Sequence, residues 1–446
     1  MNTAEELGTA PVSRLLVRYA TPAIIAMMAS SLYNLVDSIF IGHGCGAIAL
    51  GGLTIAKPFM DICAAFGSLV GVGAGTLVAI KLGERMYETA SRILGNVILM
   101  NIVISTLVMI PGLIWLDPIL LAFGASPATL VPAREYMYTI LLGNVFTHLY
   151  FGLNNVLRSM GRPLQAMTAT ILAVTLNTVL DPLFIFGLHM GVRGAALATV
   201  LAQVVAVLYE FVLFFDRRQL IHIRRSIWIL DRRITHGVLA IGLSPFLMNL
   251  AHCFVVVAIN NQLVRYGGDM AVAAYGIVFR FTFIFAMFVM GLNQGMQPVV
   301  GYNFGARSYA RMRRAFSLTA VAASLVMSMV FVLGMAVPSW LARVFTTDPS
   351  LIATSVLPCR IICCMMWCVG FQMVTGNFFT SIGRAHIAIF LSLSRQVIFL
   401  IPLLFLLPML FPDPILGVWW AMPLSDGLSA HVAMFFLLRC PELQKK

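Results

Sequence analysis

The sequence predicts an all-α membrane protein in which twelve transmembrane helices form two parallel six-helix repeats. Three observations predict this fold: an apolar composition, hydrophobic runs long enough to cross a bilayer, and an internal duplication. Hydrophobic residues make up 60% of the 446 residues and charged residues 10%, and the mean hydropathy is +0.94. A soluble domain carries about 25% charged residues. The composition therefore indicates that lipid surrounds most of this chain.

Hydrophobic runs of about 20 residues, the length of a bilayer-spanning helix, recur along the whole chain. We count twelve of them, six in each half, and they leave no room for a soluble domain. In chain order they cover residues 15–40, 50–80, 92–115, 132–156, 164–187, 192–215, 236–264, 272–302, 314–337, 352–379, 386–411 and 416–438.

The two halves of the chain are copies of one another at an offset of 222 residues. Residues 46–92 align with residues 268–314 without a gap. Matched pairs include Gly46/Gly268, Phe59/Phe281, Gly73/Gly295, Gly83/Gly305, Arg85/Arg307 and Asn155/Asn377. Duplication in an apolar chain is typical of a transporter that rocks one half against the other. We therefore predict an N-lobe at 1–215, a cytoplasmic linker at 216–235 and a C-lobe at 236–446.

The basic residues predict the orientation of the chain, whose net charge is +12. Alternate loops are rich in arginine and lysine, and the loops between them hold few, namely Arg193, Arg265 and Arg343. The basic loops hold Lys81, Arg85, Arg92, Arg158, Arg162, Arg217, Arg218, Arg224, Arg225, Arg232, Arg233, Arg307, Arg311, Arg313 and Arg314. The positive-inside rule places these loops and both termini in the cytoplasm, and an even helix count makes the repeats parallel. The charge then faces anionic lipid of the cell (inner) membrane rather than nucleic acid.

Ionisable residues within the hydrophobic runs mark a candidate coupling site, because a charge inside a bilayer is costly. Asp37 follows Tyr33 and Asn34 by one helical turn, and Asp181 follows Asn177 by one turn. Carboxylate and amide oxygens suit a hard monovalent cation. Buried carboxylates close together suit a proton equally well. Both interpretations stay open, beside that of an ordinary interhelical hydrogen-bond network.

The second repeat lacks this acid pair. At the offset that aligns Pro22 with Pro245, Asp37 corresponds to Asn260, and at the offset of 222 Asp181 corresponds to Leu403. We therefore expect ion coupling in the first half alone. The remaining ionisable residues in the runs are expected to be structural: Lys57 and Asp61 as an i, i+4 pair, and Arg280 and Arg395 with backbone carbonyls or with Asp426.

Seven segments carry a resemblance to a known family. The strongest is QPVVGYNFGA at 297–306; the others are VAIKLGER at 78–85, YNLVDSIFIG at 33–42, LRSMGRP at 157–163, LNTVLDP at 176–182, GVRGAALAT at 191–199 and AMPLSD at 421–426. Over nearly its whole length the chain resembles the multidrug and toxic compound extrusion (MATE) family, of the bacterial drug/cation antiporter type. The resemblance implies two six-helix lobes around a central cavity. It also implies export of organic cations or amphiphiles by alternating access, in exchange for inward H⁺ or Na⁺.

The resemblance also assigns the coupling site. The family's cation cluster in the N-lobe maps onto Tyr33, Asp37, Asn177, Asp181 and Thr199, and Na⁺ would lie among the last four of these. Some relatives carry further acids in helices 7 and 10, whereas here helix 7 offers only Asn260 and Asn261 and helix 10 has no acid. The resemblance implies no cofactor beyond the coupling ion, and we expect a monomer.

A drug-like small molecule is the expected substrate, and 26 methionines and 31 phenylalanines provide the deformable walls that promiscuous sites use. The candidate lining residues are Asn34, Asn154, Asn155, Met287, Met290 and Asn260. A lipid-linked sugar flippase is the alternative, which Arg280 and Arg395 favour and the acidic N-lobe disfavours. An integral-membrane enzyme would need a polar catalytic set, and none is evident. The sequence names neither the substrate nor the coupling ion.

Overall fold

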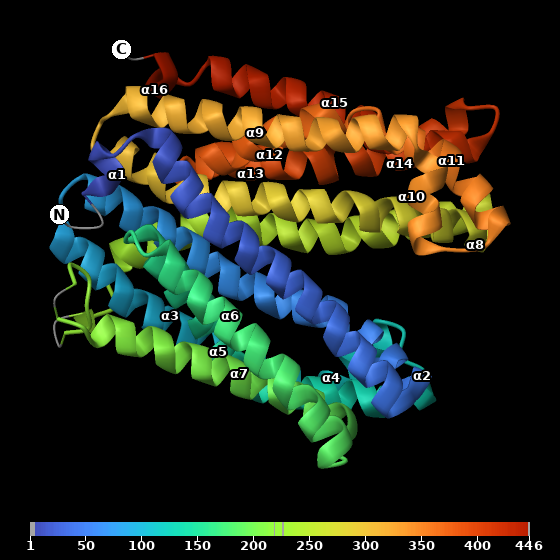
Figure 1. Cartoon of the computed structure of the whole chain (residues 1–446), viewed down its shortest axis with the longest axis horizontal. Coiled ribbons are helices and arrows are strands. Elements are labelled where there is room, and N and C mark those ends of the chain that lie inside the picture. Colours follow the sequence, from blue (N-terminus) through green and yellow to red (C-terminus); the bar gives the residue numbers. More distant parts are fainter. Residues whose placement is uncertain (1–4, 218, 225–226, 445–446) are drawn as a thin grey trace. The chain divides into compact units, whose positions relative to one another are not determined.

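A computed structural model describes residues 5–217, 219–224 and 227–444, and these are helical with short connections and no strand (Figure 1). The helices in chain order are α1 (Glu6–Thr9), α2 (Val12–Gly83), α3 (Tyr87–Ile114), α4 (Leu116–Ala122), α5 (Pro127–Ser159), α6 (Pro163–Pro182), η1 (Leu183–Gly187), α7 (Gly191–Phe215), α8 (Arg232–Gly305), α9 (Tyr309–Ala336), α10 (Pro338–Phe345), α11 (Pro349–Cys363), α12 (Met366–Ser381), α13 (Ala385–Leu393), η3 (Ser394–Leu400), α14 (Ile401–Leu410), α15 (Pro414–Leu438) and α16 (Pro441–Gln444). The segments η1 and η3 are π-helical.

The longest helices, α2 and α8, each contain two predicted spans joined at one glycine. The backbone leaves the helical conformation at Gly46 (φ 85°, ψ 176°) in α2 and at Gly268 (φ 63°, ψ −166°) in α8. A Cβ atom at either position would meet nothing within 4 Å, so conformation rather than space requires glycine. These two glycines are equivalent in the repeat, and the corner between the first two spans is thus duplicated with it.

The prediction of twelve spans is confirmed for the described part of the chain. Eight helices are long and apolar enough to cross a membrane, and α11 with α12 form a further span bent by 49°. Counting α2 and α8 twice gives eleven spans. The twelfth is α5, which is 33 residues long but less apolar, since it contains Arg134, Glu135 and Arg158. Each half of the chain therefore contributes six.

Several helices begin where the sequence supplies a capping side chain. Ser126 accepts a hydrogen bond from the Thr129 backbone N–H at the start of α5. Asp231, Asp348 and Asp413 cap the starts of α8, α11 and α15 in the same way. A proline at the first helical position follows three of these four caps. Each cap satisfies an N–H group that the helix itself leaves unpaired.

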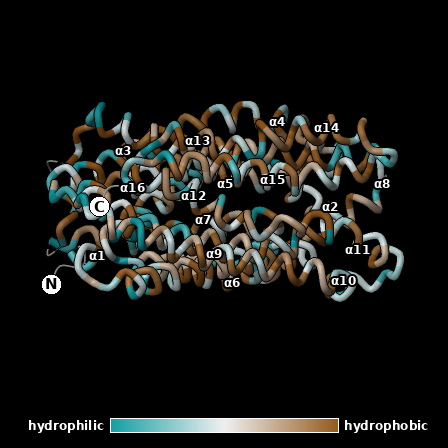
Figure 2. Tube along the Cα trace, turned by 90° about the horizontal axis from the view of Figure 1, so that it is seen from above, coloured by the Kyte–Doolittle hydropathy of each residue, from teal (hydrophilic) through white to brown (hydrophobic). Residues whose placement is uncertain are grey.

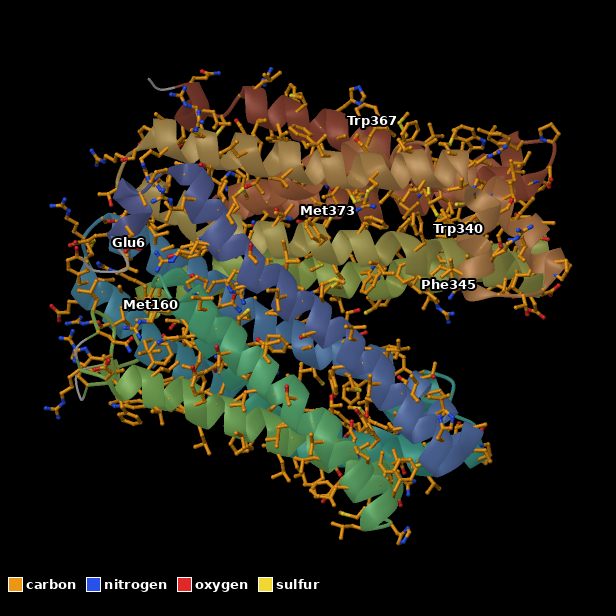
Figure 3. All side chains as sticks on the ribbon, viewed as in Figure 1. Glu6, Met160, Trp340, Phe345, Trp367 and Met373 are labelled. Carbon is orange, nitrogen blue, oxygen red and sulfur yellow. The ribbon has the colours of Figure 1, made fainter. Side chains whose placement is uncertain are left out.

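Lipid is the solvent for much of the helical surface. Hydrophobic residues predominate along the trace of the helices (Figure 2). Large apolar side chains are exposed, among them Trp340 on α10 at 62% and Trp367 on α12 at 50% (Figure 3). Because lipid tails are as apolar as these side chains, burial adds little, and close packing must hold the helices together.

The chain divides into two compact units. Unit 1 takes in the described residues of 1–10, 21–246 and 301–307, and unit 2 those of 11–20, 247–300 and 308–446. This division follows the predicted lobes except at three segments. The first turns of α2 belong to unit 2, whereas the first turns of α8 and its last turn belong to unit 1. The predicted boundaries at 215 and 236 thus stay a prediction.

Glycines explain why the start and the end of α8 belong to unit 1. A Cβ atom at Gly73 would collide with the Val238 carbonyl oxygen, and one at Gly242 would collide with that of Leu69. At the C-terminal ends of the two helices, Gly83 and Gly305 approach the backbone of the opposite helix in the same way. Two pairs of glycines thus let the second half of α2 contact α8 backbone to backbone.

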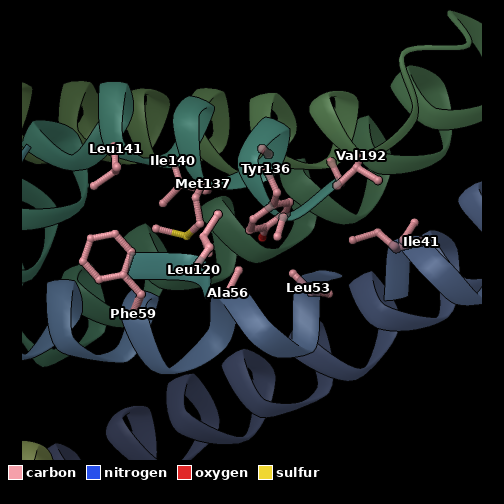
Figure 4. Close-up of a cluster of buried hydrophobic side chains, with 14 of the residues drawn as sticks. Ile41, Leu53, Ala56, Phe59, Leu120, Tyr136, Met137, Ile140, Leu141 and Val192 are labelled. Atoms are coloured by element: carbon pink, nitrogen blue, oxygen red, sulfur yellow. The ribbon is translucent and has the colours of Figure 1, made fainter. Parts of the chain in front are cut away.

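Unit 1 has its apolar core where α2, α4, α5 and α7 meet (Figure 4). Ala56 of α2, Leu120 of α4, Met137 of α5 and Ala195 of α7 are all fully buried there. The side chain of Tyr136 extends from α5 toward α2 within this cluster. Since α5 also packs on α3 and α6, it forms the centre of the unit.

Unit 2 is built around α9, α12 and α15, which pack on one another and on α11, α13 and η3. The short α16 is held by two polar contacts: Arg384 pairs with Glu442 at 2.6 Å, and Arg313 donates to the Leu443 carbonyl at 3.0 Å. The C-terminal end of the described chain is thereby fixed on the arginine-rich side.

Candidate coupling site

Three helices of unit 1 bring the predicted cation cluster together. Tyr33 and Asp37 come from α2, and Asn177 and Asp181 from α6. Thr199 comes from α7. Each pair on one helix is four residues apart, so both members face the same side. The spacing read from the sequence therefore places all five side chains on facing surfaces, and their contacts unite them.

The hydroxyl of Thr199 is the centre of the cluster. The Tyr33 hydroxyl lies 3.0 Å from Thr199 Oγ1, and the Tyr136 hydroxyl is also hydrogen-bonded to it. With the Asn177 amide oriented so that both of its ends are satisfied, its oxygen accepts from Thr199 Oγ1 at 3.0 Å and from Thr199 N at 2.9 Å. A threonine oxygen can donate one hydrogen bond and accept two. Donation to Asn177 and acceptance from two tyrosines use all three.

The carboxyl groups of Asp37 and Asp181 touch each other. Asp37 is 5% exposed and Asp181 is fully buried, and a hydrogen bond joins their side chains. The Asn177 amide donates to Asp181 Oδ2 at 2.9 Å. Within the described chain, the Oδ1 atoms of both acids are buried without a partner. Two ionised carboxylates repel at this range, so the contact requires a proton or a cation.

The oxygens of this cluster fit either coupling ion. The free Oδ1 atoms of Asp37 and Asp181 provide two charged oxygens for Na⁺, with Thr199 Oγ1 as a neutral one. The oxygen of Asn177, however, is occupied by Thr199, and its amino group faces Asp181. Asn177 would have to rotate to bind Na⁺. A proton shared between the acids needs no rearrangement.

One residue of this site was not predicted from the sequence. Tyr136 on α5 is 1% exposed, hydrogen-bonds to Thr199 and lies close enough to both acids to interact with them electrostatically. The repeat gives no signal for it, because position 358 holds proline at the offset of 222. Its segment, AREYMYTILL, has no acid at depth that would have drawn attention to it. Packing of α5 at the centre of unit 1 is what brings Tyr136 to the site.

The helix that carries Asp181 is irregular at this point. Asp181 is followed by Pro182, the last residue of α6, and by the π-helical segment η1. Proline lacks an N–H group, and π-helical turns are frequent at functional sites. Asp181 thus lies where the backbone hydrogen-bond pattern of its helix changes.

The other ionisable residues pair as predicted. Lys57 and Asp61 form an exposed ion pair at 2.5 Å, and Arg395 pairs with Asp426 at 2.7 Å. Asp426 is buried, so Arg395 balances its charge within unit 2. Arg280 lies exposed on α8. A basic cavity of the kind that a sugar-lipid flippase would need therefore loses the Arg395 charge.

The predicted substrate-lining residues are not all placed to line a cavity. Asn34 is exposed, and Asn155, Asn260, Met287 and Met290 are half-buried. Asn154 is a correction: it is buried, and its amide is bonded to Ala166, Glu210 and Arg158. The spacing of α5 gave no means of telling the adjacent positions 154 and 155 apart.

This fold, with two repeated six-span halves and a buried acid pair in the first, defines a secondary membrane transporter. A model of the MatE family matches residues 22–183 and 245–406, once in each half. The chain belongs to the MATE family of transporters, which confirms the resemblance.

Named relatives agree with this assignment. The chain is 28% identical over 437 residues to the "Multidrug export protein MepA" of Staphylococcus aureus (strain NCTC 8325 / PS 47), covering 96% of this chain and 94% of that one. The corresponding protein of Staphylococcus haemolyticus (strain JCSC1435) is 27% identical over 428 residues, with 96% and 93% covered. A solved structure of the "MATE multidrug transporter DinF-BH", in complex with a rhodamine dye, is 37% identical with a TM-score of 0.90 and 98% of each chain covered. "MATE in the bent conformation" has a TM-score of 0.93 at 25% identity, with 100% and 98% covered.

Replacing Thr199 with valine should reduce gradient-driven export about tenfold, since it leaves two buried tyrosine hydroxyls without their acceptor. Thr199→Ser keeps the hydroxyl and should stay near the wild-type rate. The control is Thr178→Val on α6, whose hydroxyl bonds only to the Val174 carbonyl of its own helix. Initial rates of transport in vesicles measure all three, and equal rates for valine and serine at position 199 would contradict the role of the hydroxyl.

Proposed function

We propose that this protein exports drug-like organic cations or amphiphiles by alternating access, in exchange for an ion that moves inward and binds at Asp37 and Asp181. The observation that carries this proposal is the buried contact between the two carboxyl groups, each with one unpartnered oxygen. Acids at membrane depth mark ion or proton pathways. The printed names of the relatives, multidrug export protein and multidrug transporter, support the substrate class.

The geometry favours H⁺ over Na⁺ as the coupling ion. The two acids share a hydrogen bond, for which one carboxyl must hold a proton, and Asn177 presents its amino group rather than its oxygen. Proton binding neutralises one charge, and proton release restores it. Each ionised acid increases the electrostatic attraction for an organic cation in the same unit, so the two cations compete through charge.

Export in sealed vesicles tests the proposed function. The readout is uptake of a cationic rhodamine dye, called rhodamine below, into inside-out vesicles that contain the protein. A pH gradient or a Na⁺ gradient is imposed in separate samples. We expect the pH gradient to drive uptake and the Na⁺ gradient to have little effect. Driving by Na⁺ alone would assign the other ion, and no response to either gradient would overturn coupled export.

We further propose that the protein spans the cell (inner) membrane as a monomer with both termini in the cytoplasm. The loop arginines support this orientation. In a variant without its eight native cysteines, a cysteine at the exposed position Ala128 should react with an impermeant maleimide added to intact cells. A cysteine at the exposed position Thr9 should react only after the cells are opened, and its labelling from outside would contradict the topology.

Asn260→Ala should leave coupling largely intact, within about twofold of wild type. Asn260 is half-buried on α8, is the repeat equivalent of Asp37 and has no charge to exchange. The ratio of pH-driven to undriven rhodamine transport measures this effect. A loss as large as that of an Asp37 variant would show that unit 2 also carries the coupling.

A further inference from the structure

A second buried acid lies in unit 1, apart from the coupling site. Glu210 on α7 is 0% exposed. Its Oε1 atom accepts a hydrogen bond from Asn154 Nδ2 at 3.0 Å, and within the described chain its Oε2 atom is buried without a partner. An unpaired carboxylate oxygen in such a place is destabilising unless it serves a purpose.

The groups around Glu210 come from two other helices. From α5, Asn154 donates to Glu210 and accepts from Arg158 Nη2 at 2.8 Å, and Arg158 and Tyr150 interact with Glu210 electrostatically. From α6 come the Ala166 carbonyl, which binds Asn154 at 2.8 Å, and Thr170. Arg158 and Tyr150 are the titratable groups that face Glu210. Arg158 thus balances the charge of Glu210 when it is ionised.

Glu210 lies toward the arginine-rich end of unit 1. It is five residues before the end of α7, and Arg158 is one residue before the end of α5. The next loop contains Arg162, and the positive-inside rule places it in the cytoplasm. Along α7, Glu210 is eleven residues from Thr199 of the coupling site, or about 16 Å at 1.5 Å per residue.

Polar side chains occupy the interval between the two sites. Thr199, Gln203 and Glu210 share one face of α7 at spacings of four and seven residues, and Thr147, Tyr150 and Asn154 follow one another on α5. The Thr147 hydroxyl donates to Gln203 Oε1 at 2.5 Å, and the Tyr150 hydroxyl donates to Thr170 Oγ1 at 2.7 Å. Because α5 packs directly on α7, these groups form a polar row inside an otherwise apolar unit.

We propose that Glu210 is the exit group for the coupling proton: it takes the proton that leaves the Asp37–Asp181 pair and releases it to the cytoplasm. This inference rests on the proposed function. One O–H bond breaks at the acid pair, and one forms at Glu210 Oε2, which neutralises the carboxylate that Arg158 balances. The O–H bond of Glu210 then breaks, and the proton passes to cytoplasmic water. Hydroxyl groups one turn apart, as at Thr147 and Tyr150, are spaced for a water to bridge them.

An exit group affects net transport differently from exchange. Proton-driven transport needs the proton to leave in each cycle, whereas exchange of rhodamine inside for rhodamine outside needs no proton release. Glu210→Gln keeps the shape and the contact with Asn154 but cannot carry the proton. We expect it to slow pH-driven rhodamine transport roughly tenfold or more, the scale of a lost acid–base group. Exchange of rhodamine should stay within about twofold of wild type.

Two variants control for a merely structural ion pair. Asp426→Asn removes the other buried acid that pairs with an arginine, in unit 2, and should change net transport and exchange alike or not at all. Thr147→Val interrupts the polar row without removing a charge and should slow pH-driven transport while sparing exchange. Glu210→Asp should recover part of the pH-driven rate.

The measurement uses the full-length protein in proteoliposomes, with rhodamine fluorescence outside and a trapped pH dye inside. A loss of net transport with intact exchange in Glu210→Gln and Thr147→Val supports the exit group. Equal losses of net transport and exchange, or a wild-type pH-driven rate in Glu210→Gln, would overturn it. If Glu210→Gln does not fold, Thr147→Val alone decides the matter by the same criterion. A wild-type protein that a pH gradient does not drive would instead refute proton coupling itself.

Discussion

Asp37→Asn and Asp181→Asn should each abolish pH-driven export of rhodamine, and the double variant should lose little more. The two carboxyl groups hydrogen-bond to each other and share Asn177 and Thr199 as neighbours. Groups that act as one unit give losses that do not add. We expect each single variant to fall at least about a hundredfold in coupled rate, the range for loss of an essential acid–base group.

The matched control is Asp61→Asn, which lies on the same helix α2 and pairs with Lys57 at the surface. It should stay near the wild-type rate, because an exposed ion pair contributes about 0–1 kcal/mol. All variants are compared at equal amounts of folded protein. Substantial pH-driven export in both single variants, with loss only in the double variant, would show that the acids act independently.

Gly73→Leu should remove most of the folded protein. A Cβ atom at Gly73 would collide with the backbone of Val238, and a backbone cannot yield as a flexible side chain does. We expect a destabilisation of about 3 kcal/mol or more, the upper end for overpacking. Gly242→Leu should behave alike, because it collides with Leu69 from the other side of the same crossing.

The control for this prediction is Gly276→Leu, on α8, where a Cβ atom would meet nothing within 4 Å. The fraction of monodisperse protein in detergent and its melting temperature measure the effect. A normal yield of Gly73→Leu with an unchanged melting temperature would contradict the close helix crossing.

The large elements of this fold could be predicted from the sequence because they depend on periodic or repeated signals. Hydrophobic runs predicted all twelve spans, and the repeat paired Gly46 with Gly268, although only the structure shows that their positive φ requires glycine. The exchange of helix starts between the units could not be predicted. It depends on backbone contacts at Gly73 and Gly242 that no pattern of hydropathy records.

The candidate site was predictable in proportion to how unusual its residues are in lipid. Asp37 and Asp181 stand out in apolar runs, and Asn177 follows from its spacing. Tyr136 and Glu210 do not stand out in this way. Tyr136 lies in a mixed segment, and Glu210 lies close enough to the end of its helix to be taken for a boundary residue. Their burial and their partners depend on how α5, α6 and α7 pack, which is tertiary information.

Proton release on substrate binding is the measurement that tests the central claim most directly. Rhodamine is added to the purified protein in lightly buffered detergent solution at a pH where the acid pair holds its proton, and a pH dye counts the protons released per bound rhodamine. If Asp37 and Asp181 exchange a proton for an organic cation, the wild type should release about one proton and Asp37→Asn none. Binding of rhodamine by the wild type without proton release, or equal release from Asp37→Asn, would contradict the claim.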